Sequence, residues 1–275
     1  MALDPPSPSA FDFLARVALS YASLLETPLA HPEIGLGGNL FYAGELDEDG
    51  RALVVAANIA GAATLAVTAD PAAQKQAIRD GVADFVVTTL DEALRILKNQ
   101  LRKRETVAVC VALTLPEIDS EMNERGVAPD LLRPDLRHEL RIPSLHQALL
   151  PQQNADALIA PEDAPKEPDP SRTPALVTWR VDSALPKDLA KLDEIALTCL
   201  DPEDWKSRRW LRLAPRYLGR LAQGLRLLDA DREFAARFID RVRQSAERSE
   251  IAVAVEISSY SRGQRDVYRF APTKP

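Results

Sequence analysis

The stretch from Gly44 to Arg51 combines two glycines with three consecutive acids, and it is the first place where this sequence could hold a ligand. A short apolar run precedes it and a helical pattern follows, so we expect a turn from a strand into a helix. In such turns glycine lets backbone N–H groups approach a phosphate, and the helix N-terminus adds positive potential. Here Asp47–Asp49 would face the phosphate, at a cost of about 1 kcal/mol for each close like-charge contact. The residues of this turn therefore argue against a diphosphate site.

The acids near this turn have other interpretations. Asp47–Asp49 could bind Mg²⁺ or Ca²⁺, but the stretch does not match an EF-hand loop, and we favour a solvated turn at a helix start. Asp70 could bind the ribose hydroxyls of a nucleotide or cap a helix that begins at Pro71. Aspartate is an ordinary N-cap residue and proline an ordinary first helical residue, so we favour the cap.

A row of arginines in the second half of the chain is the other candidate site. Arg208, Arg212, Arg216 and Arg220 recur every four residues and would line one helical face if Pro215 does not break the helix. This face could bind an anion or a nucleic acid, with nearby aromatic side chains for stacking. The aromatic residues in question are Trp205, Trp210 and Tyr217. We favour a solvated face whose aromatic residues point to the core.

A third interpretation connects the arginine row to the acidic first half of the chain. The basic helix could dock on that half, within one chain or across a dimer, because complementary potentials steer association. Lys206, Arg262 and Arg265 could contribute to such a contact.

The remaining reactive residues are isolated. His31, His138 and His146 are far apart in the sequence, so neither a metal cluster nor a catalytic triad is predicted. Cys110 lies in an apolar run and Cys199 in a helical one, which is typical of inert buried thiols. We predict no catalytic residue and no metal site.

Strands and helices alternate over the first 160 residues, which predicts the scaffold for these groups. Strands are expected at 40–43, 64–68, 84–88, 106–113 and 155–160, and helices at 11–26, 51–62, 71–80, 90–103 and 115–125. Gly126 should end the last of these helices. This order indicates an α/β fold, a Rossmann-like doubly wound parallel sheet.

The second half of the chain has a different pattern. We expect a strand at 175–181, a helix at 185–200, mostly helical structure over 205–248 and a C-terminal hairpin across Ser261–Gln264. These elements indicate a second, smaller α+β domain. The proline-rich stretch Ala160–Pro174 separates the two parts. The predicted organisation is an N-terminal tail and helix at 1–34, a Rossmann-like domain at 35–160, a linker at 161–174 and an α+β domain at 175–275.

Charge is distributed unevenly between these parts. The chain has 34 basic and 41 acidic residues, a net charge of −7. Residues 1–172 hold 15 basic and 26 acidic residues, net −11, and residues 173–275 hold the other 19 and 15, net +4. The acidic total argues against a nucleic-acid partner. Neither a membrane-spanning run nor a signal pattern is found, so a cytoplasmic soluble protein is expected.

The first domain resembles a known family, on the blocks AGELDEDGRALVVAANIAGAATLAVTAD, GVADFVVTTLDEAL and RGVAPDLL. From about Gly38 to Asp130 the chain resembles the dinucleotide-binding domain of urocanase (urocanate hydratase). The resemblance covers about a third of the chain. It implies a Rossmann-like fold, a dimer and NAD as the candidate cofactor, which urocanase uses as an electrophile toward the imidazole ring of its substrate.

The family's site residues are only partly present. Its glycine-rich turn corresponds to Asp47–Leu53, where Gly50 and Ala52 remain, and Asp70 keeps the acidic ribose position. Gly44, Gly50 and Asp70 are thus the cofactor-binding candidates. Of the stretch that lines the family's site, His138 at most remains, and the family's cysteine motif has no counterpart here.

We therefore predict a urocanase-like protein that has lost its NAD phosphate cradle and works as a non-catalytic binding or assembly protein. Its partner would be a small molecule or a protein, with a homodimer as one form. The first alternative is a nucleotide-dependent lyase of the urocanate hydratase type, bound through Asp70 and the helix start at Gly50–Arg51. The second is an anion- or nucleic-acid-binding module that uses the arginine row.

Overall fold

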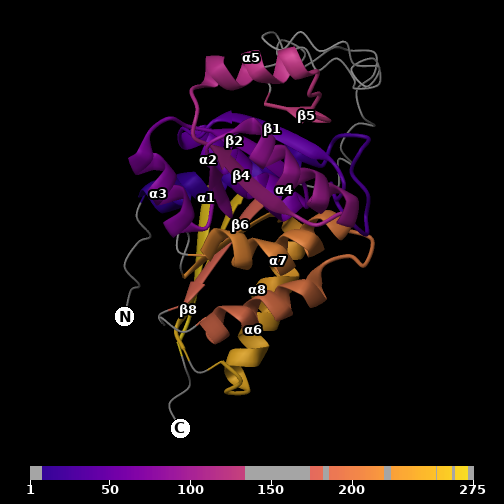
Figure 1. Cartoon of the computed structure of the whole chain (residues 1–275). Helices are drawn as coiled ribbons and strands as arrows, with labels where there is room; N and C mark the ends of the chain where they lie inside the picture. The colour runs from indigo at the N-terminus through magenta and orange to yellow at the C-terminus, as the bar shows by residue number, and fades with distance from the viewer. Residues whose placement is uncertain are drawn as a thin grey trace. The chain divides into compact units, whose positions relative to one another are not determined.

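The computed structural model of the chain describes residues 8–133, 174–181, 186–219, 224–251, 253–261 and 264–271 (Figure 1). Its contacts divide the chain into two units, Leu19–Pro161 and Met1–Ala18 with Glu162–Pro275. We call them the Rossmann-like domain and the C-terminal domain. Helix α1 (Pro8–Leu24) contributes to both units. The predicted strand at 155–160 and the predicted linker at 161–174 lie outside the described residues, except for Pro174, which begins a strand.

The Rossmann-like domain contains a five-stranded parallel sheet with the strand order β3-β4-β2-β1-β5. Its strands are β1 (Leu40–Glu45), β2 (Ala63–Val67), β3 (Phe85–Val87), β4 (Val107–Val111) and β5 (Leu131–Leu132). Its helices are α2 (Glu48–Ala60), α3 (Pro71–Asp80), α4 (Leu90–Lys103) and α5 (Leu115–Arg125). The predicted doubly wound parallel sheet is confirmed, and three helices have the predicted bounds.

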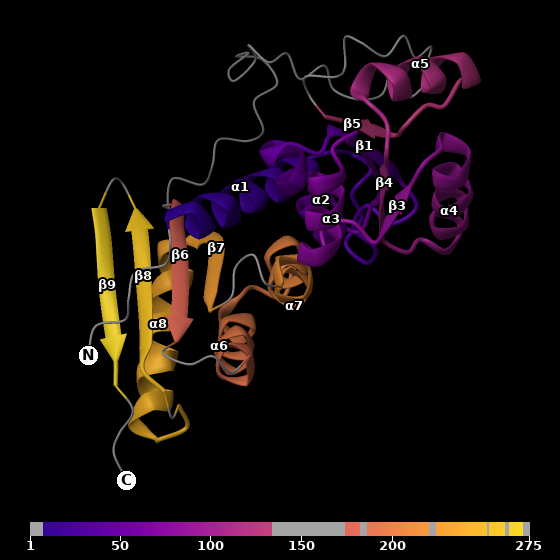
Figure 2. The same ribbon diagram turned by 60° about the vertical axis from the view of Figure 1, so that its left-hand side comes forward.

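Helices cover both faces of this sheet. Right-handed crossovers place α2 and α3 on one face and α4 and α5 on the other, because the direction of travel along the sheet reverses after β3. Figure 2 shows α3 and α4 on opposite sides of the strands. Leu90 and Leu97 of α4 and Ile118 of α5 share one buried cluster with β2 and β4. The helices that follow β2 and β4 thus lie on opposite faces, and this arrangement defines the switch point where ligands bind in open α/β sheets.

The C-terminal domain contains a four-stranded antiparallel sheet with the order β7-β6-β8-β9 (Figure 2). Its strands are β6 (Pro174–Val181), β7 (Leu225–Asp231), β8 (Val255–Ser261) and β9 (Gln264–Phe270). Its helices are α6 (Pro186–Cys199), α7 (Trp205–Leu218) and α8 (Arg232–Glu247). The predicted α+β class and the C-terminal hairpin β8–β9 are confirmed.

The region 205–248 is mostly helical, as predicted, but it also contains a strand that the sequence did not predict. Strand β7 separates α7 from α8 and pairs with β6 from Leu225 to Asp231. Leucines at 225, 227 and 228 fit a helical face as well as a strand, and only the partner strand β6 settles the choice. Helix α7 also runs through Pro215, although this residue has no N–H to donate to the helix.

A buried tryptophan and a buried carboxylate organise the core of the C-terminal domain. The Trp179 ring lies 5.0 Å from the Phe238 ring, between centroids, and is fully buried. Trp179 Nε1 donates to Asp193 Oδ1 at 3.0 Å, and Arg226 Nε donates to Asp193 Oδ2 at 3.0 Å. Burial raises the pKa of the Asp193 carboxyl, and the nearby Arg226 guanidinium opposes this rise.

A second buried carboxylate in the same sheet links side chains of three neighbouring strands. Glu256 of β8 is 3% exposed and accepts bonds from Arg180 of β6, at 2.8 Å, and from Arg269 of β9, at 2.9 Å. Desolvation opposes ionisation of Glu256, but the two guanidinium groups outweigh it and hold its pKa below the usual range. Every oxygen of this buried carboxylate therefore has a charged donor.

No helix in the described part of the chain combines the length and the apolar character that crossing a bilayer requires.

Replacing Asp193 by Ala should destabilise the C-terminal domain by about 3 kcal/mol, because Arg226 would keep a buried charge without its partner. All three tryptophans, Trp179, Trp205 and Trp210, lie in this domain, so urea unfolding followed by tryptophan fluorescence reports on it alone. Asp240→Ala is the control, since the Asp240–Arg243 pair is exposed and should contribute less than about 1 kcal/mol. Equal effects of the two substitutions would contradict the structural role of Asp193.

Candidate functional site

The carboxyl edge of the parallel sheet is where a doubly wound fold binds its ligand, and four helices begin there. These helices follow β1, β2, β3 and β4 directly. The first four N–H groups of a helix have no partner within the helix, so what they bond decides whether the edge can hold an anion.

The turn between β1 and α2 consists of only Leu46 and Asp47. Gly50 therefore lies inside the first turn of α2 and is buried against the end of β1. A Cβ at this position would lie 2.0 Å from the Glu45 carbonyl oxygen, so glycine is required for the helix to pack on the strand. Gly44 has a φ of +69° and lies where the β1–β2 register shifts, which gives it a conformational role.

Asp47 occupies the N-terminus of α2. Its Oδ1 accepts the Gly50 N–H at 2.6 Å and Arg133 Nη1 at 3.0 Å, and its Oδ2 accepts Arg133 Nη2 at 3.2 Å. Arg133 follows β5, the neighbour of β1, and its side chain is 13% exposed. Desolvation opposes ionisation of Asp47, but the bonds from Arg133 and Gly50 outweigh it and hold the pKa of the carboxyl below its usual range.

Asp70 and Arg51 are engaged within the protein as well. Asp70 Oδ1 accepts the Ala72 N–H at 2.9 Å and so caps α3, as the sequence predicted. Arg51 forms an ion pair with Asp80 at the end of α3. The groups that were expected to hold a nucleotide thus each have a partner in the chain.

The two other helices at this edge start in the same way. Thr89 Oγ1 accepts the Glu92 N–H at 3.3 Å at the start of α4. Glu117 Oε2 accepts the Thr114 N–H at 2.8 Å and the Thr114 hydroxyl at 2.7 Å at the start of α5, and these bonds lower the pKa of Glu117. All four helices at this edge therefore begin with a capping contact from their own side chains.

The edge is also rich in acids. Besides the caps Asp47 and Asp70, the first helical turns contain Glu48 and Asp49 in α2, Asp91 and Glu92 in α4, and Glu117 in α5. Carboxylates stabilise these helix starts through the helix dipole, and they repel a diphosphate at the same positions.

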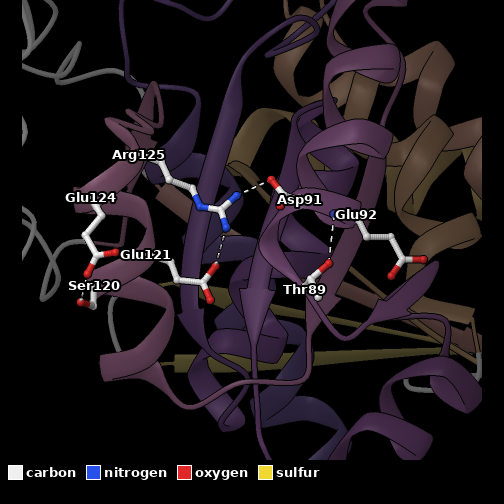
Figure 3. A network of polar contacts seen from close by, with 7 residues as sticks. All are labelled: Thr89, Asp91, Glu92, Ser120, Glu121, Glu124 and Arg125. Carbon is white, nitrogen blue, oxygen red and sulfur yellow. Dashed lines mark hydrogen bonds and ion pairs between the residues drawn. The ribbon is translucent and has the colours of Figure 1, made fainter.

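Some of these acids tie helices together. Figure 3 shows Arg125 at the end of α5, which forms ion pairs with Asp91 of α4 and with Glu121 on its own helix. In the same view Ser120 Oγ donates to Glu124 at 3.1 Å. Of these exposed contacts, the Arg125–Asp91 pair joins α5 to α4, and the other two lie within α5.

At the switch point, the ends of β2 and β4 are joined by a backbone hydrogen bond. The Thr68 N–H, just past β2, donates to the Val111 carbonyl of β4 at 3.1 Å. Cys110 lies beneath them in β4 and is fully buried, and burial raises the pKa of its thiol to about 11. Cys110 is therefore an inert small apolar residue, as expected.

Only some residues of the arginine row are exposed to solvent. Arg208 is half-buried, and its Nη1 donates to the Leu197 carbonyl at 3.1 Å. Arg212 and Arg216 are exposed on the outer face of α7, and the Arg216 guanidinium lies 5.2 Å from the Tyr217 ring centroid. Arg220 lies outside the described residues. Trp210 points to the core, where its Nε1 donates to the Leu227 carbonyl at 2.6 Å, as the solvated-face interpretation predicted.

The other candidate residues do not assemble into a site. His31 is exposed, and its Nδ1 accepts the Glu33 N–H at 3.3 Å. His138, His146 and Arg262 lie outside the described residues, and the side chain of Arg265 is not described. The described residues include no group of three or more His, Cys, Asp or Glu that could hold a metal ion. Cys199 is buried, and burial raises its pKa.

A groove of about 340 Å³ lies between α6 and α8. Its charged lining residues are Lys191, Glu194, Arg241, Arg248 and Glu250, so both signs of charge are present. Lys191 donates to the Glu250 carbonyl within this lining.

Arg133, the residue that pairs with Asp47, was not predicted as part of the site. It follows β5, a strand of two residues, which is too short to show a hydrophobic pattern. The only signal was a basic residue within reach of an acidic turn, and the parallel pairing of β5 with β1 is needed to bring them together.

The parallel sheet and its crossover helices define a Rossmann-like domain. Residues 20–136 match the family described as Urocanase, by its Rossmann-like domain. This segment is thus a urocanase-type Rossmann-like domain, and the resemblance that the sequence predicted is confirmed.

Replacing Gly50 by Ala should destabilise the Rossmann-like domain by about 3 kcal/mol, because the new methyl group meets a backbone oxygen that cannot move aside cheaply. Gly126→Ala is the matched control, since nothing lies within 4 Å of its Cβ position and only the positive φ of 63° costs about 1 kcal/mol. Thermal unfolding followed by circular dichroism measures both. A smaller loss for Gly50→Ala than for the control would show that α2 does not pack so closely on β1.

Asp47→Ala should lower the free energy of unfolding by about 1 kcal/mol near neutral pH, the usual contribution of an N-cap. Because the folded-state pKa of Asp47 lies below 3.8, its stabilising effect is present above that pH and is lost as the pH falls through the folded pKa. Urea unfolding of both proteins at several pH values should therefore show the difference shrinking on the acid side. Glu105→Ala, which removes an exposed carboxylate that lies 3.9 Å from Lys103, should show a difference within about 0.5 kcal/mol throughout.

Proposed function

We propose that this urocanase-like protein does not hold NAD at the β1–α2 turn and that it works as a non-catalytic binding or assembly protein. The observation that supports this most is the position of Asp47. Its carboxylate accepts the Gly50 N–H and binds the fork of Arg133, so the helix N-terminus already has a bound anion from the chain itself.

The residues at this turn do not fit a diphosphate. A phosphate that approached the start of α2 would have to displace the Asp47 carboxylate from Arg133 and then lie beside Glu48 and Asp49. A glycine-rich turn offers free N–H groups at this point, whereas the two-residue turn here brings Gly50 into contact with Glu45. We therefore derive no reaction step through NAD.

The alternative of a nucleotide-dependent lyase would need an anion-binding group elsewhere on the same edge. Asp70 supplies an exposed carboxylate that could accept a ribose hydroxyl, but Arg51 is committed to Asp80. A binding role asks for no such group, and this is why we favour it.

A thermal shift experiment on the full chain tests the proposal, with NAD⁺, NADH and adenosine nucleotides as probes. We expect no change in melting temperature with any of them. A ligand present at 100 times its Kd would add about 2.7 kcal/mol of stability, which a melting curve detects readily. A saturable rise with NAD⁺, release of NAD on denaturing the purified protein, or turnover of urocanate would each contradict the proposal.

A further inference from the structure

Helix α7 has a composition that sets it apart from the rest of the chain. Its 14 residues include five basic side chains and no acidic one, in a protein whose net charge is −7. The basic residues are Lys206, Arg208, Arg209, Arg212 and Arg216.

The helix packs on its domain through Trp210, which bonds the backbone of β7, and through the buried Leu211 and Ala214. Arg208, at the start of the arginine row, bonds the last turn of α6. This mounting leaves Arg212 and Arg216 exposed and one helical turn apart. In the described part of the chain, neither guanidinium has a carboxylate within ion-pair distance.

This arrangement costs stability in the isolated protein. Like charges four residues apart on a helix repel each other by a few tenths of a kcal/mol, and Arg212 faces Arg208 on one side and Arg216 on the other. The Tyr217 ring helps to position Arg216 through a cation–π contact. A rigid pair of arginine forks without carboxylates is suited to an acidic target, because each fork can bind a carboxylate through two hydrogen bonds.

The number of exposed basic side chains distinguishes between the possible anionic targets. Nucleic-acid binding draws its affinity from many phosphate contacts, and anionic membranes are bound by clusters of about four to eight basic residues. Two exposed arginines on one turn are too few for either target, and the net charge of −7 would repel a dense polyanion at long range. A protein helix with two carboxylates one turn apart matches both the number and the spacing.

We propose that Arg212 and Arg216 of α7 form a docking surface for an acidic helical segment of a partner protein. This inference rests on the proposal that the chain works by binding, and it names the class of partner.

A fluorescent glutamate-rich helical peptide, with glutamates at i and i+4, is a direct probe of this surface. Anisotropy at low ionic strength should show saturable binding to the full chain that weakens as salt is added. The same peptide with glutamine in place of glutamate should not bind. Arg212→Glu with Arg216→Glu should weaken binding at least about tenfold, since both contacts become repulsive.

The matched control is Arg241→Glu with Arg248→Glu. It makes the same change in charge in the same domain, on α8 and at the residue that ends it. It should change the affinity less than about threefold, because long-range effects of net charge are screened. Circular dichroism should show that both double variants remain folded, because all four positions are exposed. Arg212→Lys with Arg216→Lys keeps the charge and should retain most of the binding.

Three results would overturn the inference: no binding of the glutamate peptide at low salt, an equal loss in both double variants, or tighter binding to a DNA duplex or to anionic lipid vesicles than to the peptide. Each is independent of the nucleotide experiment. Binding of NAD⁺ would overturn the proposed function and leave the α7 surface intact, whereas failure of the peptide to bind would leave the nucleotide result unchanged.

Discussion

The free N–H groups at a helix start are the constraint on which the functional edge of this protein depends. A doubly wound sheet places several helix starts along one edge, and each attracts an anion through its unpaired donors and its dipole. In this chain the anions are carboxylates of its own side chains. Asp47 and Asp70 cap α2 and α3, and Glu117 closes the start of α5. The same contacts that stabilise the helices occupy the positions from which a dinucleotide-binding fold would hold its cofactor.

This constraint concerns the edge of the sheet and not the sheet itself. The parallel sheet and its crossover helices need only apolar strands, capped helices and close packing at Gly50, and all of these are present. Cofactor binding needs a turn with unoccupied donors, and the β1–α2 turn offers a carboxylate that is already paired with Arg133. The proposal that this edge does not hold NAD is therefore compatible with a urocanase-type architecture, since function belongs to the site and not to the fold.

Much of the Rossmann-like domain could be predicted because its helices have strong local signals. Asp70 and Pro71 mark the start of α3, and Gly126 marks the end of α5, so their bounds follow from capping alone. The rest depends on contacts between distant residues. Strand β5 is too short to show a pattern, so Arg133 could not be placed beside Asp47, and the leucines of β7 needed the pairing with β6 to be read as a strand. Sequence placed the acids at the turn correctly, but it could not show that one of them is a cap with a charged partner.

The Gly50 amide gives the most direct test of the central claim, because its N–H is the donor that Asp47 occupies. In a ¹H–¹⁵N spectrum of the full chain, this resonance should shift as Asp47 is protonated on the acid side of its usual pKa. At neutral pH it should not move when NAD⁺ is added in large excess. A saturable shift of the Gly50 resonance with NAD⁺ would show that a phosphate displaces Asp47, and it would contradict the account.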